Sequence, residues 1–175
     1  MKTLEDYIVS IPDFPRLGIL FRDVTGILDS GEGFHLAVEE LAKRLDGLEF
    51  DAIAGIESRG FLFGAPVAYR LGKGFIPIRK PGKLPRAVVR QSYDLEYGSA
   101  TVEMHADAVK PGQRIVVMDD LLATGGTARA AATLVERLGG VVAKILFLVE
   151  LFDLGAREGR LAGYDIDTIL KFPGH

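Results

Sequence analysis

The stretch "IVVMDDLLATGGTARAA", residues 115–131, joins an apolar run to two aspartates and then to a Gly-Gly pair flanked by threonines. A short apolar run bounded by polar residues is typical of a buried strand, which we expect over residues 114–119. Apolar side chains recur at helical spacing after Thr127 and predict a helix over residues 127–138, ended by Gly139-Gly140. A strand, a tight loop and a helix form the repeating unit of parallel sheets.

The same alternation recurs along the chain. The expected strands are 51–56, 75–78, 100–105 and 141–151, and the expected helices are 34–45 and about 61–71. Residues 1–30 are expected to be irregular around "GILF", and residues 79–98 to form a charged loop rich in Pro and Gly. The pattern predicts an α/β fold with a mainly parallel sheet flanked by helices. A chain of 175 residues fits a single domain, 1–175.

Composition narrows the functional classes. The net charge of −3 provides no overall basic field, which argues against nucleic-acid and anionic-membrane partners. The absence of cysteine excludes disulfides and thiol chemistry, and three scattered histidines do not suggest a metal site. The N-terminal "MKTLEDYIVS" lacks the apolar run of a signal peptide, and the apolar stretch 141–151 is too short to span a bilayer. We therefore expect a soluble, cytoplasmic protein.

The segment "ATGGT", residues 123–127, has the features of a phosphate-binding loop. Ligands of parallel sheets bind beyond the carboxyl ends of the strands, which singles out residues 57–60, 79–98, 120–127 and the loop after Glu150. Glycines let backbone N–H groups converge at the positive end of a helix, and Thr124 and Thr127 add hydroxyl donors. An ordinary turn with an aspartate as helix cap is the alternative.

Two carboxylates beside a phosphate narrow the choice of ligand. Asp119 and Asp120 would repel a phosphate unless the same ligand also offers hydroxyl hydrogens or brings a metal cation. A ribose 5-phosphate meets these demands, with its phosphate in the loop and its ring hydroxyls on the carboxylates. The residues thus indicate a site for a phosphorylated ribose.

"VVMDDLLATGGT" resembles the phosphoribosyl-pyrophosphate (PRPP) motif of the type I phosphoribosyltransferases, in particular the members that use adenine. The resemblance extends in family order over nearly the whole chain, through "PDFPRLGILFRDVT" (12–25), "ESRGFLFG" (57–64), "IRKPGKLP" (78–85), "SYDLEYG" (92–98) and "LVEL" (148–151). It implies the type I phosphoribosyltransferase fold, with an N-terminal hood over about 1–33 and a mobile catalytic flap over about 79–100. The implied reaction transfers phosphoribosyl from PRPP to adenine and yields AMP and pyrophosphate.

The resemblance also implies how PRPP is bound. Asp119 and Asp120 match the acids that hold the ribose hydroxyls, and the 5-phosphate loop matches Ala123, Thr124, Gly125, Gly126 and Thr127. The family's pyrophosphate site matches Glu57, Ser58 and Arg59, with Lys80 and Lys83 as further cations. Arg59 is also expected to be a catalytic residue. The Glu57–Ser58 peptide bond is expected to be cis. The alternatives are a surface ion pair between Arg59 and Glu57, and a merely solvated basic loop.

The base site and the flap follow from the resemblance alone. Glu96 matches a proton shuttle, and Tyr97 would pack the closed flap against the ligand. Phe21 and Leu151 would flank adenine, whose edge the backbone of Leu20 and Arg22 would recognise. A solvated loop charge at Glu96, and simple core packing of Phe21 and Leu151, are the corresponding alternatives.

Magnesium is the expected cofactor, held mainly through PRPP, with Asp119 or Asp120 touching its coordination shell. The family also implies a homodimer. Three other functions compete: transfer to another purine such as xanthine, a non-catalytic PRPP-sensing module, and a purely structural α/β domain. A sensing module would normally carry an added DNA-binding domain, for which 175 residues leave no room.

Overall fold

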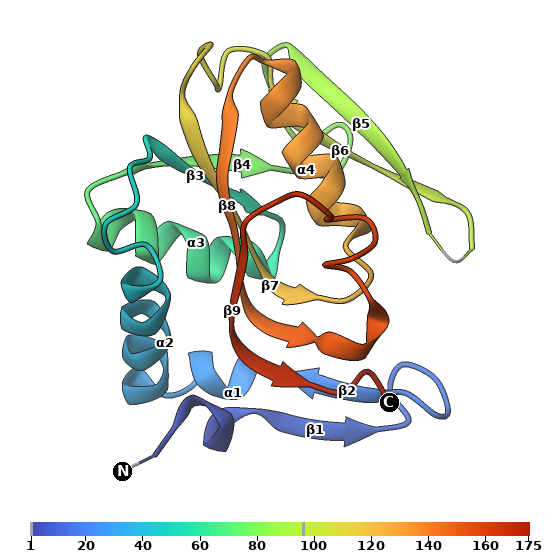
Figure 1. Cartoon of the computed structure of the whole chain (residues 1–175). Coiled ribbons are helices and arrows are strands. Elements are labelled where there is room, and N and C mark those ends of the chain that lie inside the picture. The colour runs from blue at the N-terminus through green and yellow to red at the C-terminus, as the bar shows by residue number, and fades with distance from the viewer. Residues whose placement is uncertain (1, 96) are drawn as a thin grey trace.

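A computed structural model describes residues 2–95 and 97–175 (Figure 1). Its elements in chain order are η1 (Leu4–Tyr7), β1 (Val9–Pro12), β2 (Leu20–Asp23), α1 (Thr25–Leu28), α2 (Gly31–Lys43), β3 (Ala52–Ile56), α3 (Arg59–Arg70), β4 (Gly74–Ile78), β5 (Val88–Asp94), β6 (Ser99–His105), β7 (Arg114–Leu122), α4 (Gly126–Arg137), β8 (Val141–Leu151), η2 (Phe152–Leu154) and β9 (Ile166–Phe172).

The central sheet has the strand order β4-β3-β7-β8-β9, and all of its neighbouring strands are parallel. This confirms the predicted mainly parallel sheet. All residues of β3 are buried, as expected for a strand covered on both faces. Strand β7 is longer than predicted and continues through the two aspartates to Leu122.

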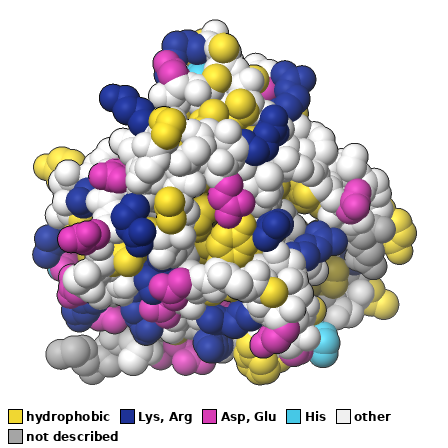
Figure 2. Space-filling view, turned by 45° about the horizontal axis from the view of Figure 1, so that its top comes forward, with side chains coloured by type: hydrophobic (Ala, Val, Ile, Leu, Met, Phe, Trp, Pro, Cys, Tyr) yellow, Lys and Arg dark blue, Asp and Glu magenta, His cyan; other side chains and the backbone are white. Residues whose placement is uncertain are grey.

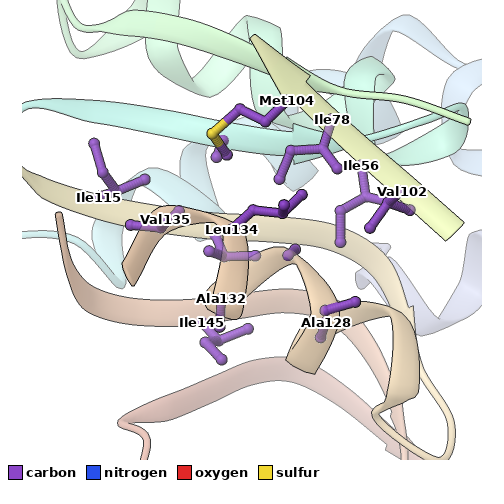
Figure 3. Close-up of a cluster of buried hydrophobic side chains, with 14 of the residues drawn as sticks. Ile56, Ile78, Val102, Met104, Ile115, Ala128, Ala132, Leu134, Val135 and Ile145 are labelled. Carbon is purple, nitrogen blue, oxygen red and sulfur yellow. The ribbon is translucent and has the colours of Figure 1, made fainter. Parts of the chain in front are cut away.

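Helices cover both faces of the sheet. Alternate strand residues point to opposite faces, so each face contributes apolar side chains to its own buried cluster. On one face, Ile53, Val116 and Met118 pack against α2 and α3. On the other face, Ile115 and Ile145 belong to a second buried cluster, which also contains side chains of α4 and of the β5–β6 hairpin (Figure 3). Small side chains on α4 let this helix lie close to the strands: Ala128, Ala131 and Ala132.

Four strands differ from the predicted pattern. Strand β5 lies within the segment expected to be a loop, and it forms an antiparallel hairpin with β6. Strands β1 and β2 form a second hairpin in the region expected to be irregular, beside the carboxyl end of β9 (Figure 1). Strand β9 itself was not predicted. These strands are short or charged, and pairing with distant residues rather than local pattern stabilises them.

A partly buried ion pair fixes the connection between β8 and β9. Glu150 accepts two hydrogen bonds of 2.7 Å from the Arg157 guanidinium and one of 2.9 Å from the Thr168 hydroxyl. Arg157 also donates to the carbonyl of Ile166 at 2.9 Å. The arginine side chain lowers the pKa of Glu150 and keeps it ionised. The loop after β8 is thereby attached to β8 and to the edge strand β9.

Candidate active site

The ends of β3, β4 and β7 meet beside the N-termini of α3 and α4. Parallel pairing matches Gly55 with Met118, so the residues that follow in each strand emerge at the same edge. A cavity of about 320 Å³ opens there. Its lining residues are Ile56, Glu57, Ser58, Arg59, Lys80, Tyr93, Val102, Asp119, Asp120 and Thr127. The structure thus brings together residues that lie far apart in the sequence.

The predicted phosphate loop joins β7 to α4. Gly125 has a φ of 86°, a left-handed conformation that favours glycine, and no side chain caps α4 within the described residues. Gly125 also packs tightly: an added Cβ would lie 3.1 Å from Leu161 and 3.3 Å from Ala156. Residues 121–128 line a cavity of about 90 Å³ here, together with Asp119 and Phe147. An uncapped helix N-terminus favours an anion at this place.

Arg59 and the two aspartates form the charged centre of the site. Arg59 Nε lies 2.7 Å from Asp120 Oδ2, and Asp119 Oδ1 accepts a 2.8 Å hydrogen bond from the N–H of Asp120. Burial, followed by the charge of Asp120, raises the pKa of Asp119 well above the ordinary aspartate value. Gly60 permits this closeness, because a Cβ there would lie 2.9 Å from Asp119 Oδ1.

Glu57 is occupied by the neighbouring basic loop and not by Arg59. Its Oε1 accepts from Arg79 Nε at 3.2 Å and from the N–H of Lys80 at 2.7 Å. The alternative of an Arg59–Glu57 ion pair is therefore wrong, since Arg59 pairs with Asp120. The Glu57–Ser58 bond is cis, as predicted.

The two predicted lysines lie in different positions. Lys80 lines the larger cavity. Lys83 is exposed, and its carbonyl lies 3.5 Å from Arg79 Nη1. The structure therefore brings Lys80, and not the Lys83 side chain, to the cavity wall.

The hood contributes an aromatic side chain next to this centre. The Phe21 ring lies 5.8 Å from the guanidinium carbon of Arg59 and packs edge-on against Phe14 at 5.1 Å. Phe21 and Leu151 are both only partly buried, so each keeps an exposed side. Leu151 also packs against the buried cluster on the α2–α3 side of the sheet, as the alternative of core packing expects, while Phe21 does not belong to either buried cluster.

Leu20 and Arg22, whose backbone is predicted to recognise the edge of adenine, lie in β2, which pairs with β1. Leu20 pairs with Pro12 and Arg22 with Ser10. The Arg22 side chain stacks over the Phe172 ring at 4.5 Å, while its Nε is buried without a hydrogen-bond partner among the described residues. The hood is thus attached to the end of β9.

The predicted flap corresponds to the β5–β6 hairpin and the residues before it. Glu96 lies outside the described residues. Tyr97 is 74% exposed, and its ring lies 5.8 Å from the guanidinium carbon of Arg16 in the hood. Sequence reasoning assigned no role to Tyr93, whose hydroxyl accepts a 3.1 Å hydrogen bond from Thr127. Only the alternation of β5 against β6 could have indicated which way Tyr93 points.

Charged side chains of both signs are interspersed on the face shown in Figure 2. Within residues 2–95 and 97–175, no group of three or more potential metal-ligating side chains occurs. None of the helices in this described part has the length and apolar character needed to cross a bilayer.

Comparison with known proteins identifies relatives over the whole chain. The family described as "Phosphoribosyl transferase domain" matches residues 25–170. An adenine phosphoribosyltransferase of Agathobacter rectalis is 59% identical over 174 residues, covering 99% of each chain.

Solved structures agree in fold. The crystal structure of adenine phosphoribosyltransferase from Thermoanaerobacter pseudethanolicus has a TM-score of 0.94 and 55% identity, covering 97% of this chain and 100% of that one. The Saccharomyces cerevisiae enzyme, solved with adenine and an imino-altritol bisphosphate, has a TM-score of 0.88 and 37% identity, covering 94% and 95%. The sheet, its two helical layers and the hood therefore follow the type I phosphoribosyltransferase fold.

The raised pKa of Asp119 predicts a gain of stability on removing its charge. The folded pKa lies above the unfolded value, so ionisation destabilises the folded state as pH rises from about 4. Asp119→Asn keeps an oxygen that can accept from the Asp120 N–H. We expect its melting temperature at pH 7 to exceed that of the parent by a few degrees, and the difference to shrink towards pH 4.

Asp107→Asn is the matched control for this measurement. Asp107 is exposed, and the Arg86 side chain lowers its pKa, which is the opposite direction. This variant should leave the melting temperature unchanged or slightly lower. A lower melting temperature of Asp119→Asn at pH 7 would show that the ionised carboxylate stabilises the fold.

Proposed function

The chain belongs to the adenine phosphoribosyltransferase family, and we propose that it transfers phosphoribosyl from PRPP to adenine, yielding AMP and pyrophosphate. One observation carries the proposal: an acidic pair lies directly beside an uncapped helix N-terminus, with an arginine between this pair and an aromatic ring. This arrangement matches the separate demands of ribose hydroxyls, a 5-phosphate, a pyrophosphate and a flat base.

We infer that PRPP binds across the β3 and β7 ends. The ribose hydroxyls would donate to Asp119 and Asp120, and the 5-phosphate would accept from the N–H groups and hydroxyls of residues 123–127. Hydrogen bonds from two hydroxyls stabilise ionised carboxylates and would offset the cost that raises the Asp119 pKa.

The pyrophosphate would lie against residues 57–59 and the basic loop. Arg59 would exchange Asp120 for the leaving group, since its side chain is partly exposed and lines the cavity. Lys80 would add charge at the cavity wall, and Lys83 would reach the pyrophosphate only if the basic loop moves towards it. The Glu57 carboxylate positions the basic loop through Arg79 and the N–H of Lys80. Neutralising the developing charge on pyrophosphate lowers the barrier to breaking the bond at the anomeric carbon.

The site residues fit Mg²⁺ that is bound mainly through the substrate. The cavity offers carboxylate oxygens from Asp119 and Asp120, and Asp120 is already paired with Arg59. Mg²⁺ commonly keeps several waters and binds through one or two carboxylates plus substrate phosphates. When bound with PRPP, the ion would neutralise pyrophosphate charge.

The hood would bind adenine beside the ribose site. Phe21 would stack on one face of the base and Leu151 would cover the other, with the backbone of Leu20 and Arg22 at its edge. A carbonyl that accepts from the exocyclic amine of adenine would face an acceptor oxygen on a 6-oxo purine. This repulsion would select adenine over xanthine or hypoxanthine.

The hairpin would close over the reacting atoms as the catalytic flap. Glu96 is proposed to take up the imidazole proton of adenine, and Tyr97 to pack against the closed site. Closure excludes water, which would otherwise hydrolyse the oxocarbenium-like transition state. The chain is thus proposed to be one domain, with a hood over about 1–33 and a flap over about 79–100.

The remaining proposals concern the biological setting. We propose a cytoplasmic enzyme of purine salvage that forms a homodimer, as the family resemblance implies. A mass near 19.0 kDa by light scattering, the value of one chain, would contradict the dimer.

The direct test is product formation with PRPP, Mg²⁺ and each of adenine, hypoxanthine, guanine and xanthine. We expect AMP and pyrophosphate from adenine alone, and no product from the double variant Asp119→Ala/Asp120→Ala. Turnover with a 6-oxo purine only would retain the transferase chemistry and refute the proposed base site. PRPP binding without turnover of any base would favour a sensing module.

Phe21→Ala tests the base site. Stacking of a base on an aromatic ring contributes roughly 1–3 kcal/mol, so the KM for adenine should rise about five- to 150-fold. The KM for PRPP should change little, because the variant leaves the loop of residues 123–127 intact. Tyr69→Ala removes a 90% exposed aromatic side chain on α3 and serves as the control. An unchanged adenine KM in Phe21→Ala would remove this residue from the site.

A further inference from the structure

Two hydrogen bonds join the last two residues of β5, beside the turn of the β5–β6 hairpin, to the phosphate loop and to the β8–β9 connection that packs against it. Thr127 Oγ1 donates to the hydroxyl of Tyr93 at 3.1 Å, and Arg160 Nη1 donates to the carbonyl of Asp94 at 3.1 Å. Strand β5 packs along α4, so both contacts lie beside the N-terminus of this helix (Figure 1). The proposed roles in catalysis use neither Tyr93 nor Arg160.

These side chains surround a cavity of about 330 Å³ on the outer side of the phosphate loop. Its lining residues are Tyr93, Asp94, Leu95, Thr124, Gly126, Thr127 and Arg160. Arg160 lies directly over the loop, since a Cβ added at Gly126 would collide with its Nη1. A cation, a phenol and two threonine hydroxyls therefore converge on the loop that is proposed to hold the 5-phosphate.

The position of Arg160 is set by the packing of the loop between β8 and β9. Arg157 anchors this loop through its ion pair with Glu150. Leu161, the residue after Arg160, is fully buried and would contact a Cβ added at Gly125 at 3.1 Å. The backbone on both sides of Arg160 is therefore fixed, although its side chain is exposed.

A phosphate in the loop would change the Thr127–Tyr93 hydrogen bond and would give Arg160 an acceptor in addition to the Asp94 carbonyl. A hydroxyl has one proton to donate, so Thr127 cannot donate to Tyr93 and to a phosphate oxygen together. Once Thr127 turns to the phosphate, the Tyr93 hydroxyl is free to donate to the threonine oxygen or to the phosphate. Arg160 has five N–H donors and can bind a phosphate oxygen while it retains Asp94.

We propose that Tyr93 and Arg160 are positioning residues that couple 5-phosphate binding to the placement of β5. Phosphate in the loop fixes both side chains, both side chains fix β5, and β5 carries the flap. Pyrophosphate alone would leave the two hydrogen bonds as they are. The inference rests on the proposed function for its assignment of the 5-phosphate loop.

A tryptophan reporter tests the coupling directly. The chain contains no tryptophan, so Leu95→Trp, at a side chain that is 48% exposed just beyond β5, introduces a single emission signal. Ribose 5-phosphate without base should shift this emission in the reporter protein, and pyrophosphate should not. Adding Tyr93→Phe or Arg160→Gln should reduce the shift at saturating ribose 5-phosphate at least about threefold.

Ser92→Ala is the matched control on the same strand. The Ser92 hydroxyl bonds to that of Thr101 at 2.8 Å and stays within the hairpin, so the emission shift should persist. Tyr93→Phe keeps the ring and its packing, which separates the loss of the hydroxyl from misfolding. An undiminished shift in both Tyr93→Phe and Arg160→Gln, or a comparable shift with pyrophosphate alone, would overturn the coupling.

Steady-state kinetics separate this inference from the proposed function. Tyr93→Phe and Arg160→Gln should each raise the KM for PRPP about five- to twentyfold, with the KM for adenine within about twofold of the parent. Equal rises in both KM values would overturn the specific role in 5-phosphate binding. Absence of turnover in the parent protein would refute the proposed function, while the emission shift with ribose 5-phosphate would still decide the coupling.

Discussion

The parallel pairing of β3 with β7 is the constraint on which the rest of the site depends. It fixes the register of the two strands. Strand β3 ends at Ile56, and the neighbouring strand β7 continues through Asp119 and Asp120. The helix after each strand begins at the same edge of the sheet. Arg59, the first residue of α3, therefore lies within ion-pair distance of Asp120. The main-chain hydrogen bonds between the strands thus bring the charged residues together.

Glycine and alanine set how closely these elements approach. Gly60 brings α3 against Asp119, Gly125 lets the phosphate loop pack on Leu161, and the alanines of α4 bring that helix near the strands. A larger side chain at any of these places would separate groups that are proposed to act on one ligand. The loop between β8 and β9 also contributes to this close packing. The Glu150–Arg157 ion pair holds this loop in the position where Leu161 and Ala156 pack against Gly125.

Local pattern predicted the buried parts of the fold, because apolar periodicity is a property of contiguous residues. Glycine spacing is equally local, and it is the basis of the phosphate site that is proposed at residues 119–127. Local pattern did not predict β5, whose sequence "VVRQSYD" is half polar and gains its structure from pairing with β6. The partner of Arg59 could not be inferred for a similar reason: Glu57 is near in sequence, whereas Asp120 is brought near by β-pairing. Family resemblance provided Arg59 and the hood, which no periodicity indicates.

On the roles proposed for its two members, the Arg59–Asp120 ion pair makes the site selective between a whole substrate and its fragments. On the proposed roles, a ligand with pyrophosphate but no ribose draws Arg59 away and leaves Asp120, 4% exposed, without its counter-charge beside Asp119. A ribose phosphate without pyrophosphate takes Asp120 and leaves the guanidinium without an anion. PRPP replaces both halves of the pair at once, so only the intact molecule avoids an unpaired charge. On these roles, the ion pair competes with ligands for both residues, and it would weaken the binding of fragments more than the binding of the complete substrate.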